Sequence, residues 1–440
     1  MEQLIGVIPE ATSNADPEEV RSRNWRSWAV CALCVLALVF VLQVFSPIRL
    51  NTDAVVLLSI GESAAEGLGS LDHGAKTVFP PGYPAILAAL MKLGLAHSAV
   101  LIGLNLSSLA VGLFFAYMVI RRTFPCSPAT TLNIILLSLL SWVVVKHSTI
   151  PLTDFPFFAL CAACLLLMTQ AWLVSSLSHF LLLMAASWLV LLGSLLMRRV
   201  GLSLVPALIY VLVSRREIRE LVGRIPEKAK FLTALCSVMF VIGTVFTISK
   251  TSTLIDFSTI VAQTGIGHML LRVIGYRLTD LTELFVNAPM TRIPDSLRTI
   301  ITVLGLCALV AIGRVLFARR RTLAPLDVFI LSYFGILFLW PYSDARFLIP
   351  VVPFLFAYIF IGLPKSDNAI LRFAVAGYFA VFVFLGIAAL GYSTRLTFSH
   401  QRFADLYGDW RIRASYCQAF HTCSAPPGNP KVVRLIQKYN

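Results

Sequence analysis

Charged side chains are scarce in this sequence. Asp, Glu, Lys and Arg make up 13% of its 440 residues, whereas about a quarter of the residues of an ordinary soluble domain are charged. The apolar share is correspondingly high, at 58%. This composition excludes a water-soluble enzyme. Acidic residues are the scarcer sign: 22 Asp and Glu stand against 36 Lys and Arg, which gives a net charge of +14.

The apolar residues form runs that are long enough to cross a hydrocarbon core of about 30 Å as helices. Arg, Lys, Pro or Gly bound most of these runs. We therefore predict an all-α, polytopic membrane protein with about eleven transmembrane helices. The predicted spans lie near residues 28–45, 100–120, 132–145, 155–174, 180–197, 202–213, 231–248, 300–317, 328–341, 347–363 and 373–390.

Basic residues are unevenly divided between the connections of these spans. The connection after residue 213 alone holds six, namely Arg215, Arg216, Arg219, Arg224, Lys228 and Lys230. The short connections on the opposite side hold only Lys146, Arg198, Arg199 and Arg346. Because cytoplasmic loops carry the excess of Lys and Arg, the N-terminus is predicted inside and the C-terminus outside. The positive charge is thus explained without nucleic acid as a partner.

No internal repeat, low-complexity tract or linker to a second large domain interrupts the chain. Five acidic residues precede the first apolar run, so residues 1–27 are predicted to be a cytoplasmic tail and not a cleaved signal peptide. A transmembrane domain is predicted over 28–391 and a small extracytoplasmic segment over 392–440. Within the domain, residues 46–99 form a first outer loop with surface helices, and residues 250–299 form a second long outer loop. The lack of a repeat argues against many secondary transporters.

Most of the nine cysteines fall inside predicted helices. The pairs Cys31/Cys34 and Cys161/Cys164 have the spacing of redox or metal motifs, yet no second pair or His stands near them, so packing is the simpler explanation. Cys417 and Cys423 lie in the outer tail, where an oxidising compartment would permit a disulfide between them. The pairing is left open.

The first outer loop begins with an acid. Asp53 follows Thr52 and opens an apolar run over 54–67, so its carboxylate is expected near the positive end of a helix. Glu62 lies further along the same run, which has the pattern of a helix on the membrane surface. The alternative role for Asp53 is that of an N-cap.

A proline-rich turn follows, with Pro80, Pro81, Gly82 and Tyr83 leading into an apolar helix. Prolines fix the backbone at this entry, and the amide groups at the start of the helix could bind an anion. A rigid entry into a short helix is the alternative.

A second acid, Asp154, lies between Leu152 and Phe155 at the predicted outer boundary. A carboxylate is costly to desolvate there, so a partner or a function is expected, with a cap role as the alternative. Arg198 and Arg346 stand in short outer connections, and Asp344 accompanies the latter. Arginine matches phosphate oxygens in a bidentate manner, so both are candidate phosphate ligands. Snorkelling, or pairing with Asp154 or Asp344, is the alternative.

Taken in order, these motifs resemble those of the C-type (GT-C) membrane glycosyltransferases, in the branch of protein O-mannosyltransferases and the aminoarabinose transferase of lipid A. Members have an acid in the first outer loop, a surface helix, a proline-rich turn and a second acid in the next outer loop. Phe79 stands before the turn, where relatives often have a cation. Lys76 or Arg346 would take the place of that cation.

The resemblance implies transfer of a sugar from a polyprenyl or dolichyl phosphate to a lipid, glycan or protein acceptor on the outer face of a membrane. Asp53 would be the base or would orient the acceptor, with Asp154 second. Arg198, Arg346 and Lys76 would contact the donor phosphate. Glu62, Pro80, Pro81, Tyr83, His147 and Asp344 would line the substrate cavity. Some relatives use a divalent metal and others do not, so the cofactor is left open.

Three other classes of membrane protein fit some of these features. A multi-pass transporter or flippase would also have many helices, although its ionisable groups would be expected near the membrane midplane. An assembly factor would not require the acids and the proline-rich turn. An acyltransferase would need a His or Cys near the site, and His147 beside Asp154 is the obvious candidate. Small outer loops favour a bacterial inner membrane.

Overall fold

The computed structural model describes the chain over residues 17–72, 74–77, 79–215, 265–362, 368–399, 403–407, 410–422 and 427–440, and at the single positions 217, 220 and 262. Almost all of this is helical, and the only sheet in the described part is a two-stranded hairpin, β1 (Leu71–Asp72) with β2 (Ala75–Lys76). The all-α class is confirmed.

Within the described ranges, seven helical stretches are long and apolar enough to cross a membrane. They are Ser27–Phe45 in α1 (Pro17–Leu42) and η1 (Gln43–Phe45), α4 (Ser98–Thr123), α7 (Asp154–Leu173), α8 (Leu177–Met197), α14 (Asp295–Ala318), Ala345–Gly362 in η4 (Ala345–Val351) and α16 (Val352–Gly362), and α17 (Ala369–Phe398). Shorter apolar helices are α5 (Pro128–Leu139), α15 (Pro325–Leu337), and η2 (Arg199–Ser203) with α9 (Leu204–Ser214). The predicted span 231–248 lies outside the described residues, so the count of eleven stays a prediction.

One predicted span is interrupted. Residues 132–145 were expected to form one helix, but the structure has α5 and then a separate α6 (Trp142–His147). The side chain of Asn287 lies in the break: its Oδ1 accepts from the amide of Trp142 at 2.6 Å, and its Nδ2 donates to the carbonyl of Leu140 at 3.0 Å. These hydrogen bonds replace backbone hydrogen bonds of a continuous helix. Asn287 follows α13 (Ile266–Val286), far along the chain, so the local sequence pattern could not reveal the break.

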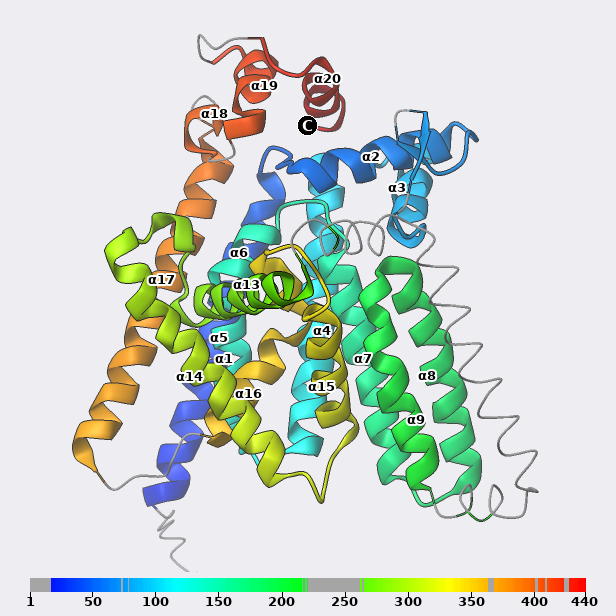
Figure 1. Cartoon of the computed structure of the whole chain (residues 1–440). Coiled ribbons are helices and arrows are strands. Elements are labelled where there is room, and N and C mark those ends of the chain that lie inside the picture. Colours follow the sequence, from blue (N-terminus) through cyan, green and yellow to red (C-terminus); the bar gives the residue numbers. More distant parts are fainter. Residues whose placement is uncertain are drawn as a thin grey trace, which may run out of the picture.

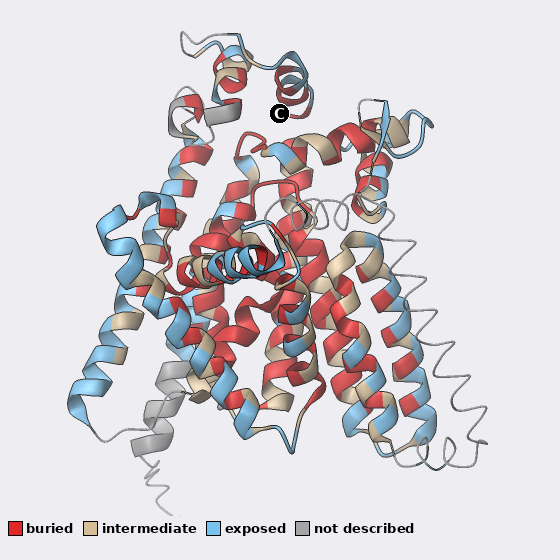
Figure 2. Ribbon diagram, in the orientation of Figure 1, coloured by how far each residue is buried: buried red, intermediate tan, exposed pale blue. Residues whose placement is uncertain are grey.

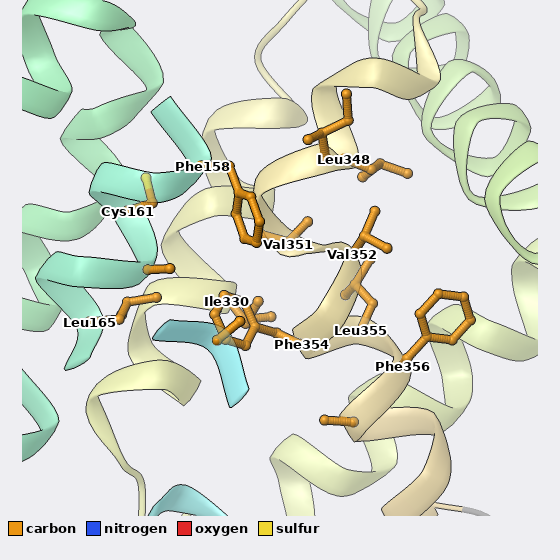
Figure 3. Close-up of a cluster of buried hydrophobic side chains, with 14 of the residues drawn as sticks. Phe158, Cys161, Leu165, Ile330, Leu348, Val351, Val352, Phe354, Leu355 and Phe356 are labelled. Carbon is orange, nitrogen blue, oxygen red and sulfur yellow. The ribbon is translucent and has the colours of Figure 1, made fainter. Parts of the chain in front are cut away.

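The core of the bundle is centred on α7. This helix packs against α4 and α8, and against η4. Figure 3 shows Phe158, Cys161 and Leu165 of α7 facing Ile330 of α15 and the apolar side chains of η4 and α16. Close packing with α4 requires Gly112, because a Cβ there would lie 2.5 Å from the ring of Phe158. Cys161 and Cys164 are buried in this cluster as packing residues.

The outer helices expose apolar side chains. Figure 2 shows buried residues through the centre and exposed ones along α8, α14 and α17. Leu189 of α8, Val310 of α14 and Phe384 of α17 are all more than half exposed. Such surfaces would be a liability in water but suit a lipid environment. The chain is a multi-pass membrane protein.

Short helices gather at one end of the bundle, which we call the α2 end (Figure 1). They include α2 (Thr52–Ala65) and α3 (Gly82–Lys92) of the predicted first outer loop, which pack on each other. The predicted tail contributes α18 (Phe403–Leu406), α19 (Trp410–Phe420) and α20 (Pro430–Tyr439), and α20 packs on α2. Residues 46–99 and the tail are therefore on the same side of the bundle.

Candidate active site

Both predicted acids stand in the first turn of a helix. Asp53 follows Thr52 at the start of α2, and Asp154 is the first residue of α7. Neither serves as the cap. Asn51 caps α2, because its Oδ1 accepts from the amide of Ala54 at 2.9 Å. Thr153 occupies the N-cap position of α7. The capping alternative is therefore wrong for both acids, and their carboxylates are available for other partners.

Arg198 pairs with Asp154. It lies at the C-terminal end of α8, and its guanidinium forms an ion pair with the Asp154 carboxylate. The Asp154 side chain is 2% exposed and that of Arg198 15% exposed. A carboxylate this deeply buried needs a positive partner. The pair also ties the start of α7 to the end of α8.

Arg346 pairs with two acids. Asp344 caps η4 by accepting from the Arg346 amide at 3.0 Å, and its Oδ2 lies 2.9 Å from the Arg346 Nε. The far end of the same guanidinium forms an ion pair with Asp53, 293 positions away in the sequence. Asp53 and Asp344 are each about one third exposed, so the carboxylates remain accessible while the arginine is buried between them.

The two ion-paired groups meet at one aromatic ring. The guanidinium carbons of Arg198 and Arg346 both lie 5.4 Å from the centre of the Phe347 ring. Asp154 also interacts electrostatically with Arg346. Five predicted site residues thus form one cluster: Asp53, Asp154, Arg198, Asp344 and Arg346. Three carboxylates and two guanidiniums leave it with one excess negative charge when all are ionised.

The proline-rich turn brings Tyr83 to this cluster. Gly82 begins α3 against the end of α8, where a Cβ would lie 2.7 Å from the carbonyl oxygen of Leu196. Pro81 occupies the N-cap position. Tyr83 is fully buried. Burial is the main cause that raises the pKa of its hydroxyl, and the negative charge of Asp154 raises it further. Its hydroxyl has no hydrogen-bond partner within the described part of the chain, so a substrate oxygen could supply one.

His147 is buried near the same charges. Its Nδ1 lies 2.8 Å from the carbonyl oxygen of Val143. Burial lowers its pKa to about 3, with Lys146 and Arg346 adding to this effect and Asp154 opposing it. The imidazole is therefore neutral at pH 7, and its Nδ1 is engaged with the backbone.

Two predicted residues lie away from the cluster. Glu62 is nine positions after Asp53, on the opposite face of α2. Its carboxylate is held by three side chains of α20, namely Arg434, Lys438 and Tyr439. Lys76 is exposed on β2, and no ion pair joins it to the five charged residues in the described structure. Its role at the donor phosphate stays a prediction.

The pairing of Cys417 with Cys423 was left open by the sequence. Cys417 in α19 is disulfide-bonded. Cys423 lies outside the described residues, so the pairing stays open. Metal binding depends on grouped ligands. Within the described ranges, no three His, Cys, Asp or Glu side chains are grouped so that they could hold a metal ion.

A second charged cluster next to Asp344 was missed by the sequence analysis. On α13, Arg277 lies 3.1 Å from Asp280, and the Ser343 hydroxyl donates to Asp280 at 2.8 Å. Burial raises the pKa of Asp280 to about 7, although Arg277 and the Ser343 hydrogen bond act in the opposite direction. Residues 269, 273, 277, 280 and 284 are buried at helical spacing. That period could have revealed a helix with two charges on its inner face inside the predicted loop 250–299.

No family model and no curated protein matches the chain. Three solved structures are similar to it. ArnT from Cupriavidus metallidurans bound to undecaprenyl phosphate has 14% identity and a TM-score of 0.49, with 88% of this chain and 80% of ArnT covered. The same protein in the apo state has 14% identity and a TM-score of 0.48, with 94% and 74% covered.

The third is the archaeal oligosaccharyltransferase AglB from Archaeoglobus fulgidus in complex with an inhibitory peptide and a dolichol-phosphate. It has 13% identity and a TM-score of 0.48, with 92% of this chain and 61% of AglB covered. ArnT and AglB have the GT-C fold, which is the fold that the sequence motifs resemble. Identities this low and TM-scores below 0.5 leave the function to be argued from the residues of this chain.

Proposed function

We propose that the chain is a membrane glycosyltransferase that moves a sugar from a polyprenyl-phosphate donor to a lipid, glycan or protein acceptor. The observation that carries the proposal is one charged cluster around the Phe347 ring. In it, ion pairs connect three acids, Asp53, Asp154 and Asp344, to two arginines, Arg198 and Arg346. Sequence position separates these residues widely, yet the fold brings them to one place. Such a cluster offers both a proton acceptor and a binding site for an anionic leaving group.

In the proposed reaction, an acceptor hydroxyl oxygen bonds to the anomeric carbon of the sugar. The bond from that carbon to the lipid phosphate breaks, and the phosphate leaves with the electron pair. Asp53 accepts the hydroxyl proton or orients the acceptor, because its carboxylate is accessible and held in place by Arg346. Asp154 is the second acid, held by Arg198.

The two guanidiniums are proposed to stabilise the negative charge that develops on the departing phosphate. Each already has an acid partner, so phosphate binding would add to the existing pairs or compete with them. The Tyr83 hydroxyl, which has no hydrogen-bond partner among the described residues, is proposed to donate to an oxygen of the sugar donor or of the acceptor. We place this site on the outer face of a bacterial inner membrane, with the N-terminus cytoplasmic and the C-terminus extracytoplasmic. The basic connection after residue 213 supports that orientation.

The proposal is tested by measuring sugar release from a panel of labelled polyprenyl-phosphate sugars by the purified protein, with added divalent metal and with a chelator. We expect Asp53→Asn to lower turnover by at least a hundredfold at equal folded yield. Glu66→Gln is the matched control, because Glu66 is an exposed acid at the end of the same helix. If the wild type releases sugar from no donor, the transferase is ruled out and a transporter or flippase becomes the better hypothesis.

A further inference from the structure

The backbone just before α2 is held by side chains of the predicted tail. The Tyr416 hydroxyl accepts from the Leu50 amide at 2.8 Å and donates to the Ile48 carbonyl at 2.7 Å. The Tyr407 hydroxyl donates to the Leu50 carbonyl at 2.8 Å. The Asn440 Oδ1 accepts from the Ile48 amide at 3.1 Å. Every backbone polar group of Ile48 and Leu50 therefore has a side-chain partner from the tail.

These side chains satisfy the backbone groups that a neighbouring strand would satisfy in a sheet. Ile48 and Leu50 are fully buried, and a buried backbone needs a hydrogen-bond partner for each amide and carbonyl. Residues 47–51 have neither helical nor strand structure. Two tyrosine hydroxyls hold this backbone, and the two rings pack with Phe403 in one aromatic cluster. The buried side chain of Arg49 holds the same segment from the other direction, because it donates three hydrogen bonds to α17.

The position of this segment determines where Asp53 lies. Leu50 precedes Asn51, the cap of α2, and Asp53 is in the first turn of that helix. The other end of α2 is held as well, because Arg434, Lys438 and Tyr439 of α20 bind Glu62. The tail therefore fixes α2 at both ends while Asp53 faces Arg346.

We propose that Tyr416 and Tyr407 are positioning residues for the reaction. They hold residues 48–50, and through them the first turn of α2, so that the Asp53 carboxylate meets the acceptor in the orientation required for transfer. Neither tyrosine contacts the substrate. This inference rests on the proposed function, since it assigns the two residues to the same site. Small displacements of a reacting group are enough to slow catalysis by orders of magnitude.

The test compares Tyr416→Phe, Tyr407→Phe and the double variant with wild type in the full-length protein. Tyr416→Phe keeps the ring and removes two hydrogen bonds, and Tyr407→Phe removes one. Tyr210→Phe is the matched control, because the Tyr210 hydroxyl also donates to a backbone carbonyl, that of Leu323, on other elements. We expect kcat to fall about tenfold in Tyr416→Phe and further in the double variant, with the donor KM unchanged. Tyr210→Phe should match wild type.

Amide hydrogen exchange supplies a readout that does not depend on activity. Exchange over residues 48–57 should rise in Tyr416→Phe and not in Tyr210→Phe. Unchanged exchange there overturns the inference whatever the activity shows. A rise in exchange with an unchanged kcat overturns it too, because α2 would then be held without consequence for the reaction. Failure of the wild type to release sugar from any donor overturns the proposed function itself.

Discussion

At the scale of single residues, the two arginines of the site share three acids: Arg198 pairs with one and Arg346 with two. Asp53 was recognisable from the sequence because it opens an apolar run, and Asp154 because a carboxylate is costly to desolvate at the predicted outer boundary. Arg198 and Arg346 stood out as rare basic residues in short connections. Pairing with Asp154 or Asp344 was expected as the alternative to phosphate binding, and both pairs are present. The pair between Arg346 and Asp53 was not predictable, since these two residues meet only through the tertiary fold.

The burial of Asp154 leads to a prediction about stability. Arg198→Met should lower the free energy of unfolding by about 3 kcal/mol, because it leaves a buried carboxylate without its partner. Asp154→Asn should cost less, since the arginine is closer to the surface. The double variant should be more stable than the sum of the single effects implies. The apparent unfolding temperatures of the four proteins in detergent measure this cycle; additive shifts would mean that the two residues are not coupled.

At the scale of elements, helices with long apolar runs were predictable and their neighbours were not. The runs fixed α1, α4, α7, α8 and α17, because burial in lipid imposes a length and a composition. The break between α5 and α6 depends on Asn287, and the inner face of α13 depends on contacts with residues 342 and 343. The partners of both features are distant in sequence. No local pattern contains the break, whereas the helical period of α13 marks its inner face but not what that face contacts.

The contact between α20 and α2 should depend on pH. Burial alone would raise the pKa of Glu62, but hydrogen bonds from Lys438 and Tyr439 and the charges of Lys438 and Arg434 lower it below the ordinary 4.5. An acid whose pKa is lowered in the folded state stabilises that state at every pH above its ordinary, unfolded pKa. This stabilisation is lost as the pH falls from the unfolded pKa through the lower pKa of the folded state. The protection of the α20 amides, which is the intrinsic exchange rate at each pH divided by the observed rate, should therefore fall several-fold below pH 4.5.

Two variants check this explanation. Glu62→Gln should show the lower protection of the α20 amides already at pH 7 and little further change in protection on acidification. Glu66→Gln, one turn away on α2, should behave as wild type. A pH response that persists in Glu62→Gln would mean that another group controls the contact.

At the scale of the whole molecule, the arrangement of the chain across the membrane follows from charge. Residues 46–99 and the tail share one side of the bundle, as Figure 1 shows, and the basic connection after residue 213 was predicted on the other side. The structure shows that the two segments lie on the same side. Which side of the membrane that is remains a prediction from the positive-inside rule.

Labelling of single cysteines tests this orientation in intact cells. Glu66→Cys at the end of α2 should react with a membrane-impermeant maleimide added outside. Arg320→Cys, between α14 and α15, should react only after the membrane is permeabilised. Both sites are exposed, so access is limited by the bilayer alone. Labelling of the unsubstituted protein measures the reaction of the native cysteines and is subtracted. The reverse labelling pattern would mean that the chain has the opposite orientation.

The dependence of the first outer loop on the tail has a consequence for how the protein is made. Leu50 leaves the ribosome 366 residues before the tyrosine that holds it. During synthesis, its amide and carbonyl must be satisfied by water or by other groups until the tail has been translocated to the same side. The proposed site would then stay incomplete throughout insertion, and a chain stalled in the membrane would not carry out chemistry on the lipid-linked sugars around it.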